Sequence, residues 1–439
     1  MNVEKMVKLV NDLLGVWYKA GSNPSQCLGI VLYVMCLKKM IEENACKNAD
    51  HMNTVLAITK ILYRPTSFDD IDILRKGADV LEETYDLEQG LLHDVLYTSR
   101  YQEELWKKAV LNTVEIVSQM EINEAAAEFF VYKISKEYGN EYTSPHTVAE
   151  LLAIGANVKD GDSVLDGTVG NGYSALECIR GKQVSFCGVD VRTEAIRNTA
   201  MYLILSDKKD FQLMNEDFTA INTAGLYDKV VMDIPFGLKT DKLVGFQTVR
   251  AHNWMDNVSC KEMECLFLAE GLDSLKDHGR MVVIVPQGFL FKQSKGLSAF
   301  RKNVVQRGML KAVVALPPVY NYTTINTAML VFESGNEDVL FVDATKLIER
   351  ERRLDPIFRP DNKMLLHEIL EEKKTVVNIS FTVPKDEVLK VADWSIGKYQ
   401  TRVTAPAYRS LTEINQELSE CYKKLDGLND RNNRLELFR

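Results

Sequence analysis

Residues 164–173 read Val-Leu-Asp-Gly-Thr-Val-Gly-Asn-Gly-Tyr, the most informative stretch of the sequence. A short apolar strand ends in Asp166, the chain turns through Gly170 and Gly172, and a helical pattern begins at Tyr173. Both glycines can adopt a positive φ and let the backbone pass close to a ligand. Backbone amides at the start of a helix can receive an anionic group. The stretch therefore predicts a cofactor-binding turn between a strand and a helix.

Short apolar runs alternate with helical patterns on both sides of this turn. The runs that we expect to be strands are residues 163–165, 184–189, 229–232, 281–285, 312–316 and 327–332. Helical patterns lie between most of them, at residues 173–181, 192–206, 261–277 and 297–307. Such alternation predicts an α/β fold with a doubly wound, mostly parallel sheet, whose active crevice lies at the carboxyl ends of the strands.

The sequence on either side of this sheet region reads as helical. Residues 1–138 carry apolar side chains at helical spacing and predict an all-helical N-terminal domain. Residues 139–345 form the expected sheet domain, and residues 346–439 read as a charged helical extension. Apolar side chains at three-four spacing from Leu411 to Leu435 predict either a coiled-coil-like helix that faces a partner or a helix packed on its own chain.

The composition is that of a globular chain with an acidic balance. The 439 residues are 46% hydrophobic and 26% charged, with a formal net charge of −9. A protein that grips DNA alone usually has a basic surface, so a local basic face or a partner would have to make phosphate contacts. Residues 238–260, with several basic side chains, are either a loop that faces DNA or a plain surface loop.

The cysteines and the apolar runs argue against a metal-binding protein and against a membrane-spanning protein. The eight cysteines show no spacing typical of a metal site. Scattered thiols in a chain of this length are typical of a reducing compartment. No apolar run is long enough to span a bilayer. We therefore expect a cytoplasmic protein that binds no metal and no membrane.

Carboxylates follow the next two expected strands. The run 184–189 ends at Asp190, whose carboxylate can accept both hydroxyl groups of a ribose. Asp217 follows the expected third strand and could accept an adenine amino group. The glycine pattern also fits a dinucleotide fingerprint, so an NAD enzyme and a chance match stay open. Asp166 favours S-adenosylmethionine, because a carboxylate there would hold the ammonium group and repel a pyrophosphate.

The fourth expected strand runs into Asp233, Ile234, Pro235 and Phe236. The exocyclic amine of adenine is a poor nucleophile, because its lone pair is delocalised into the ring. The Asp233 carboxylate and the Ile234 carbonyl could accept its two hydrogens. Pro235 would stiffen the turn, and Phe236 could stack on a base flipped out of a duplex. The alternative is an ordinary turn, with the aspartate as a helix cap and the phenylalanine in the core.

With both turns placed, the chain resembles the N6-adenine DNA methylases of the type I modification-subunit family. The family's D-P-A-C-G-S-G-x-F is similar to residues 166–174, and its catalytic N-P-P-F is similar to residues 233–236. Its Y-F/Y-T-P segment, which closes over the cofactor, is similar to residues 141–145. Nearly the whole chain is covered, through further likeness at residues 8–43, 279–291, 312–332 and 383–399.

The resemblance implies a class I methyltransferase sheet of seven strands and methyl transfer from S-adenosylmethionine to N6 of adenine in double-stranded DNA. It also implies a restriction–modification complex, with a separate specificity subunit on the N-terminal domain and the C-terminal helix and with room for a nuclease subunit. Catalysis is assigned to Asp233, Ile234, Pro235 and Phe236. Cofactor binding is assigned to Tyr142, Thr143, Pro145, Asp166, Gly167, Gly170, Gly172, Tyr173, Asp190, Asp217 and Phe218.

The chain departs from the family's motifs within both turns. Gly167, Val169 and Asn171 replace proline, cysteine and serine in the first turn. Asp233 and Ile234 replace asparagine and proline in the second. These departures leave two other functions open. One is a catalytically weak or silent scaffold in a defence complex, and the other is an enzyme that methylates RNA or a protein amide.

Overall fold

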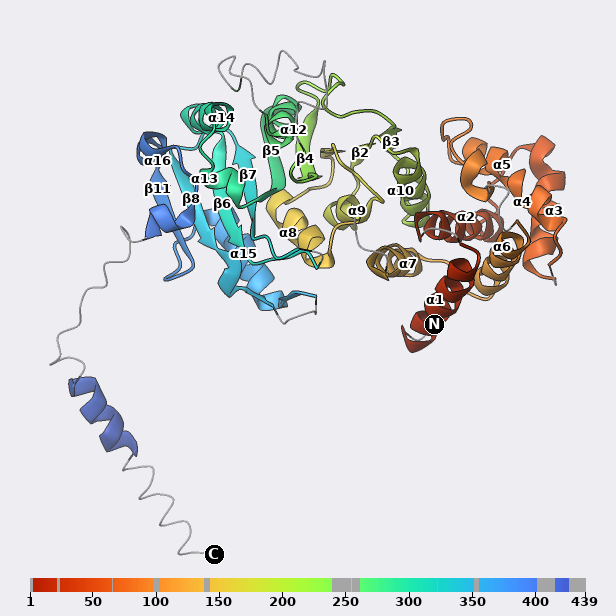
Figure 1. The fold of residues 1–439 in the computed structure, drawn as a ribbon, viewed down its shortest axis with the longest axis horizontal. Coiled ribbons are helices and arrows are strands. Elements are labelled where there is room, and N and C mark those ends of the chain that lie inside the picture. Colours follow the sequence, from red (N-terminus) through yellow and green to blue (C-terminus); the bar gives the residue numbers. More distant parts are fainter. Residues whose placement is uncertain are drawn as a thin grey trace, which may run out of the picture. The chain divides into compact units, whose positions relative to one another are not determined.

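This computed structural model describes residues 3–21, 24–64, 66–97, 103–137, 143–238, 254, 261–321, 323–350, 355–400 and 415–425. Tyr142 and most of the loop 238–260 lie outside the described residues. Residues Met1–Ser395 form one compact unit, and residues Ile396–Arg439 form a second one. The first unit begins with a group of helices and continues into a large sheet flanked by further helices (Figure 1).

The central sheet has nine strands in the order β11-β8-β6-β7-β5-β4-β1-β2-β3. Neighbours from β3 to β5 run parallel, β7 runs antiparallel between β5 and β6, and β11 runs antiparallel to β8. The strand bounds are β1 (Ser163–Asp166), β2 (Ser185–Val189), β3 (Phe211–Met214), β4 (Tyr227–Asp233), β5 (Leu275–Pro286), β6 (Leu310–Leu316), β7 (Thr327–Glu333), β8 (Asp338–Asp343) and β11 (Ser380–Pro384).

This sheet confirms the predicted α/β class and the mostly parallel, doubly wound arrangement. It has nine strands where the sequence led us to expect seven, because β8 and β11 extend it beyond β6. β8 lies inside the expected sheet domain, where its four apolar residues stand between two aspartates, and β11 lies in the extension that the sequence predicted to be helical. Beyond residue 346, β11 and the two-stranded pair of β9 (Ile348–Glu349) and β10 (Ile357–Phe358) accompany the expected helices.

Helices cover both faces of the sheet, as two glycines show. A Cβ atom added to Gly155 in α8 would lie 2.9 Å from Val282, and one added to Gly271 in α12 would lie 2.7 Å from Met281. Val282 and Met281 are consecutive in β5, and consecutive side chains of a strand point to opposite faces. The helices of the sheet region are α8 (His146–Ala156), α9 (Tyr173–Ile179), α10 (Thr193–Leu205), α12 (Met263–Asp273), α13 (Gly288–Phe291), α14 (Lys295–Gln306), α15 (Pro360–Glu372) and α16 (Lys385–Val391).

The N-terminal region is helical, as predicted, and α2 lies at its centre. Residues 27–37 of α2 are buried throughout, which is typical of a helix that is apolar all round. Lys39 of α2 pairs with Asp207 after α10 at 2.7 Å, so this helix also packs against the sheet region. The helices are α1 (Val3–Lys19), α2 (Pro24–Glu42), α3 (Met52–Leu62), α4 (Asp70–Arg75), α5 (Gly77–Thr84), α6 (Glu103–Ser118) and α7 (Glu124–Glu137).

The second unit contains a helix at residues 415–425, and every side chain of that helix is exposed. The coiled-coil prediction for the C-terminal segment falls partly outside the described residues and stays a prediction, as do the domain boundaries at residues 138 and 345. Among the described residues, no helix combines the length and apolar character needed to cross a bilayer.

Candidate active site

A cavity of about 440 Å³ opens at the carboxyl ends of β1, β2 and β4. Its wall is formed by the glycine turn 167–171, by residues 190–192 after β2, by residues 216–218 after β3 and by the turn 233–236 after β4. Parallel strands bring their carboxyl ends to one edge of a sheet, so turns that are far apart in the sequence meet there. The volume lies within the range typical of small-molecule sites.

The glycine turn has the conformation that its sequence demands. Gly170 and Gly172 adopt φ values of 57° and 80°, a region that side chains with a Cβ rarely occupy. At Gly167, an added Cβ would lie 2.7 Å from the ring of Phe218, which is itself buried and stacked on Phe267 with ring centroids 6.5 Å apart. Only glycine at residue 167 therefore lets the turn pack this closely against the Phe218 ring.

Asp166 lies behind this turn rather than on the cavity wall. Its side chain is 2% exposed and accepts a hydrogen bond of 2.9 Å from the backbone N–H of Thr168. The pKa of Asp166 is raised to about 8, mainly by burial; the nearby carboxylates of Asp233 and Asp190 also raise it, and the Thr168 N–H lowers it. A cation next to this carboxyl group would reverse that preference and favour the charged form.

Asp190 sits on the wall between the glycine turn and Arg192. Its carboxylate accepts hydrogen bonds from the Gly170 N–H at 3.1 Å and from the backbone N–H of Arg192 at 2.9 Å. The guanidinium of Arg192 donates to both oxygens of Asp190, at 3.1 Å each. A ribose that uses the same carboxylate must share it with Arg192 or displace that side chain.

The charged side chains on the cavity wall indicate which cofactor can bind there. Four carboxylates line the cavity, from Asp190, Glu216, Asp217 and Asp233, whereas Arg192 is the one cationic side chain among the described lining residues. S-adenosylmethionine carries a sulfonium and an ammonium group, which suit such a wall. A dinucleotide would bring its anionic pyrophosphate into it, so the charge favours S-adenosylmethionine over NAD.

A buried hydroxyl group supports the presence of a ligand in this cavity. Ser174 lines the cavity, and its Oγ is buried without a hydrogen-bond partner among the described residues. Buried polar groups are rarely left unpaired, and such a hydroxyl can bind a polar group of a ligand. Together with the charge of the wall, this unpaired hydroxyl group is what a site for S-adenosylmethionine would present.

The second turn presents a half-buried carboxylate beside two aromatic rings. Asp233, the last residue of β4, accepts a hydrogen bond from the hydroxyl group of Tyr320, and Ser144 lies close enough to act on the same carboxyl group. Burial raises the pKa of Asp233, and the two hydroxyl groups oppose that rise. The Phe236 ring meets the Tyr320 ring edge-on, with centroids 5.4 Å apart and planes at 88°.

Most of the predicted site residues border this one cavity, although their roles stay proposed. Those on its wall are Thr143, Gly167, Gly170, Tyr173, Asp190, Asp217, Phe218, Asp233, Ile234, Pro235 and Phe236. Asp166 and Gly172 are not on the wall, and Pro145 lines a neighbouring cavity of about 420 Å³ that shares Tyr173. Tyr142 lies outside the described residues.

A family model for the N-6 DNA methylases matches residues 120–404, which is more than half of the chain. The chain belongs to this family. Family membership makes it a DNA adenine methyltransferase, and it confirms the resemblance seen in the sequence. No match was found among curated protein sequences.

Solved structures show the same fold for the methylase. The methyltransferase subunit of a type I restriction–modification system from Streptococcus thermophilus gives a TM-score of 0.75 at 17% identity, covering 91% of this chain and 99% of that chain. A chain from a study of type I restriction–modification assembly gives a TM-score of 0.64 at 15% identity, covering 98% of each. The type IIG endonuclease BpuSI gives 0.54 at 14% identity, covering 87% of this chain and 45% of its own.

The structure adds residues to the methylase site whose contacts the sequence did not predict. Asn171 joins the glycine turn to the upstream segment, since its amide donates to Thr143 Oγ1 at 3.0 Å. Glu264 holds the second turn by accepting from the Gly237 N–H at 3.1 Å. Tyr320 follows β6 and reaches Asp233 across 87 positions of sequence. No local pattern announces contacts between such distant positions.

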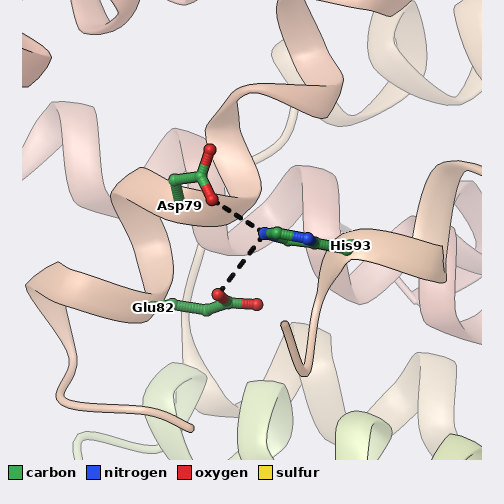
Figure 2. A group of neighbouring side chains, drawn as sticks. All are labelled: Asp79, Glu82 and His93. Carbon is green, nitrogen blue, oxygen red and sulfur yellow. Dashed lines mark hydrogen bonds and ion pairs between the residues drawn. The ribbon is translucent and has the colours of Figure 1, made fainter. Parts of the chain in front are cut away.

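Away from the cavity, Figure 2 shows Asp79, Glu82 and His93 of the methylase facing one another. His93 Nε2 lies 2.7 Å from Asp79 and 3.7 Å from Glu82. Glu82 is 4% exposed, and its two oxygens accept from the backbone N–H groups of Gly90 and Leu92, at 2.8 and 2.6 Å. The cluster therefore has a structural explanation: it fastens the loop after α5.

Proposed function

We propose that the methylase transfers the methyl group of S-adenosylmethionine to N6 of adenine in double-stranded DNA, as the modification subunit of a restriction–modification complex. One observation carries this proposal: Gly170 of the first turn and Phe236 of the second line the same cavity. A cofactor held by the first turn and a base held by the second would therefore meet, and positioning reacting groups in this way supplies much of the rate of such reactions.

Three groups of this chain are placed to hold the cofactor. The Asp190 carboxylate would accept the ribose hydroxyl groups, Asp217 would accept the adenine amino group, and Asp166 would stabilise the ammonium group from behind the glycine turn. When bound, S-adenosylmethionine supplies an electrophilic methyl group on a sulfonium. The Ser174 hydroxyl would gain the partner that the protein does not provide.

The second turn would prepare the adenine. The Asp233 carboxylate and the Ile234 carbonyl would accept the two hydrogens of N6 and free its lone pair for attack. Phe236 is half-buried on the cavity wall, where its face can stack on a flipped base. The edge-on contact with Tyr320 would hold this ring in place.

The assembly with other subunits rests on the likeness to type I systems and on the charge of the chain. A methyltransferase subunit of such a system shares the fold over nearly all of this chain. The net charge of −9 favours a partner that makes phosphate contacts, beside any local basic face of this chain. We propose a specificity subunit that reads the DNA sequence and contacts the N-terminal helices and the C-terminal helix, with a nuclease subunit as a further partner.

Transfer of a tritiated methyl group tests the proposed function. The chain, with and without the products of neighbouring genes, is incubated with DNA, with RNA and with protein, and the labelled DNA is digested to nucleosides. We expect the label in N6-methyldeoxyadenosine. Label in RNA or in a glutamine amide would show that the methylase acts on another substrate and would refute the proposed DNA methylation. A chain that shows no cofactor binding by calorimetry would be a silent scaffold.

A further inference from the structure

Two hydroxyl groups from separate parts of the chain act on the catalytic carboxylate. Tyr320, which follows β6, donates to the side chain of Asp233 at the end of β4, and Ser144, which precedes α8, lowers the pKa of that carboxyl group. Tyr320 is 2% exposed, so water does not compete freely for its hydroxyl group. All three residues line the cavity between the two turns.

A hydroxyl donor matches a carboxylate better than an amide. An ionised aspartate only accepts hydrogen bonds, whereas an asparagine presents an N–H₂ group that needs acceptors of its own. Hydrogen bonds to a charged group are also stronger than those between neutral groups. The surroundings of residue 233 therefore suit the aspartate of this chain, and they do so through residues that belong to other elements.

On the basis of the proposed function, we infer that Asp233 is the base that takes the proton of N6, and that Tyr320 and Ser144 are positioning residues that hold it as an aimed carboxylate. N6 forms a bond to the methyl carbon as the bond from that carbon to sulfur breaks, with its electron pair left on sulfur. N6 then carries a positive charge and a surplus proton. Asp233 accepts this proton and later releases it to water.

One substitution separates the role of the Tyr320 ring from the role of its hydroxyl group. Tyr320→Phe keeps the edge-on contact with Phe236 and removes the donor to Asp233. Its matched control is Tyr202→Phe, because Tyr202 of α10 is also fully buried and its hydroxyl has no hydrogen-bond partner among the described residues. Both variants lose one buried oxygen, but only Tyr320→Phe removes a hydrogen bond to the Asp233 carboxylate.

The first readout needs neither cofactor nor DNA. The protonation of Asp233 is followed in the ligand-free protein by the infrared band of its protonated carboxyl group, identified by its loss in Asp233→Asn. We expect Tyr320→Phe to move this titration to higher pH by roughly one to two units, the equivalent of a lost hydrogen bond to a charge. Ser144→Ala should move it in the same direction, and Tyr202→Phe should leave it in place.

The second readout is the pH profile of single-turnover methyl transfer with cofactor and DNA saturating. The acidic limb of the profile should move to higher pH by the same amount in Tyr320→Phe. In Asp233→Asn the limb should vanish, so that adding Tyr320→Phe causes no further shift. This coupling separates a positioning role from a general loss of structure.

Different results would refute the inference about Asp233 and the proposed DNA methylation. An infrared titration and a pH profile that stay at their wild-type positions in Tyr320→Phe would overturn the inference while DNA methylation stands. A shift of the profile that is equally large in the Asp233→Asn background would also overturn it. A wild-type chain that binds the cofactor but labels RNA or protein in place of DNA would instead refute the proposed function.

Discussion

Asp166 is a buried carboxylate whose proton is expected to respond to the cofactor. Its pKa of about 8 makes it mostly protonated at pH 7 in the ligand-free protein. The ammonium group of S-adenosylmethionine would favour the ionised form, so binding at pH 7 should release a proton from this group. The measurement is the binding enthalpy in buffers of different ionisation enthalpy. Binding without proton release would remove Asp166 from the cofactor site.

The same residue shapes the stability of the ligand-free methylase. The pKa of Asp166 is raised from 3.8 to about 8, so the folded chain binds more protons than the unfolded chain between these values. The free energy of unfolding contributed by this group therefore falls as the pH rises through that window. Asp166→Asn serves as the control, because it should remove both this slope and the proton release.

Among the individual residues, the sequence predicted those at the ends of strands but not the residues that contact them. Asp190 and Asp233 were recognisable because each follows an apolar run and belongs to a known motif. Tyr320 and Asn171 were not, because their partners Asp233 and Thr143 are brought near only by the sheet. The bond from Arg192 to Asp190 was also missed, since short-range pairing of charges is common on surfaces.

At the scale of elements, the glycine turn depends on a close approach to the segment after β3. In Gly167→Ala, the added Cβ would start 2.7 Å from the Phe218 ring, which is 2% exposed and cannot move outward. The ring or the turn must shift toward the cavity, at a cost of about 1–3 kcal/mol of overpacking. We expect cofactor affinity to fall at least about tenfold by calorimetry, along with a lower melting temperature.

A glycine in an open place provides the comparison for this variant. Gly15 of α1 has no atom within 4 Å of an added Cβ, and it lies inside a helix. Gly15→Ala should leave cofactor affinity unchanged and raise stability by about 0.5–1 kcal/mol. Unchanged affinity in Gly167→Ala as well would show that the bare backbone at this turn is not needed for the cofactor.

The strands of the sheet differ in how clearly their own sequences predict them. The buried parallel strands β2 and β4 and the antiparallel β7 appear as continuous apolar runs, and their predicted positions agree with the structure to within a few residues. β8 begins and ends in aspartate, and β11 pairs with one neighbour at the edge of the sheet. Such strands are decided by pairing with the existing sheet rather than by their own pattern.

For the whole molecule, the compact unit Met1–Ser395 should fold without the C-terminal segment. A chain that ends at residue 400 loses the helix 415–425, whose side chains are all exposed. We expect its melting temperature to change by less than about 2 °C and its cofactor affinity to stay the same. Early melting or loss of cofactor binding would show that the segment supports the fold.

The same truncation tests the proposed partner surface. If the C-terminal helix contacts a specificity subunit, the shortened methylase should be captured less well by that subunit than the full chain. The ability of the isolated chain to bind S-adenosylmethionine should not differ between the two. Equal capture of both chains would place the contact elsewhere on the methylase.

The proposed function depends on two turns that have different roles at one cavity. Calorimetry combined with single-turnover transfer to DNA measures both roles in the variants Asp190→Ala and Asp233→Ala. Asp190→Ala should lose most of its affinity for S-adenosylmethionine. Asp233→Ala should bind the cofactor within a few-fold of the wild-type affinity and yet transfer no methyl group to adenine. Transfer at the wild-type rate by Asp233→Ala, or unchanged cofactor affinity in Asp190→Ala, would contradict the account.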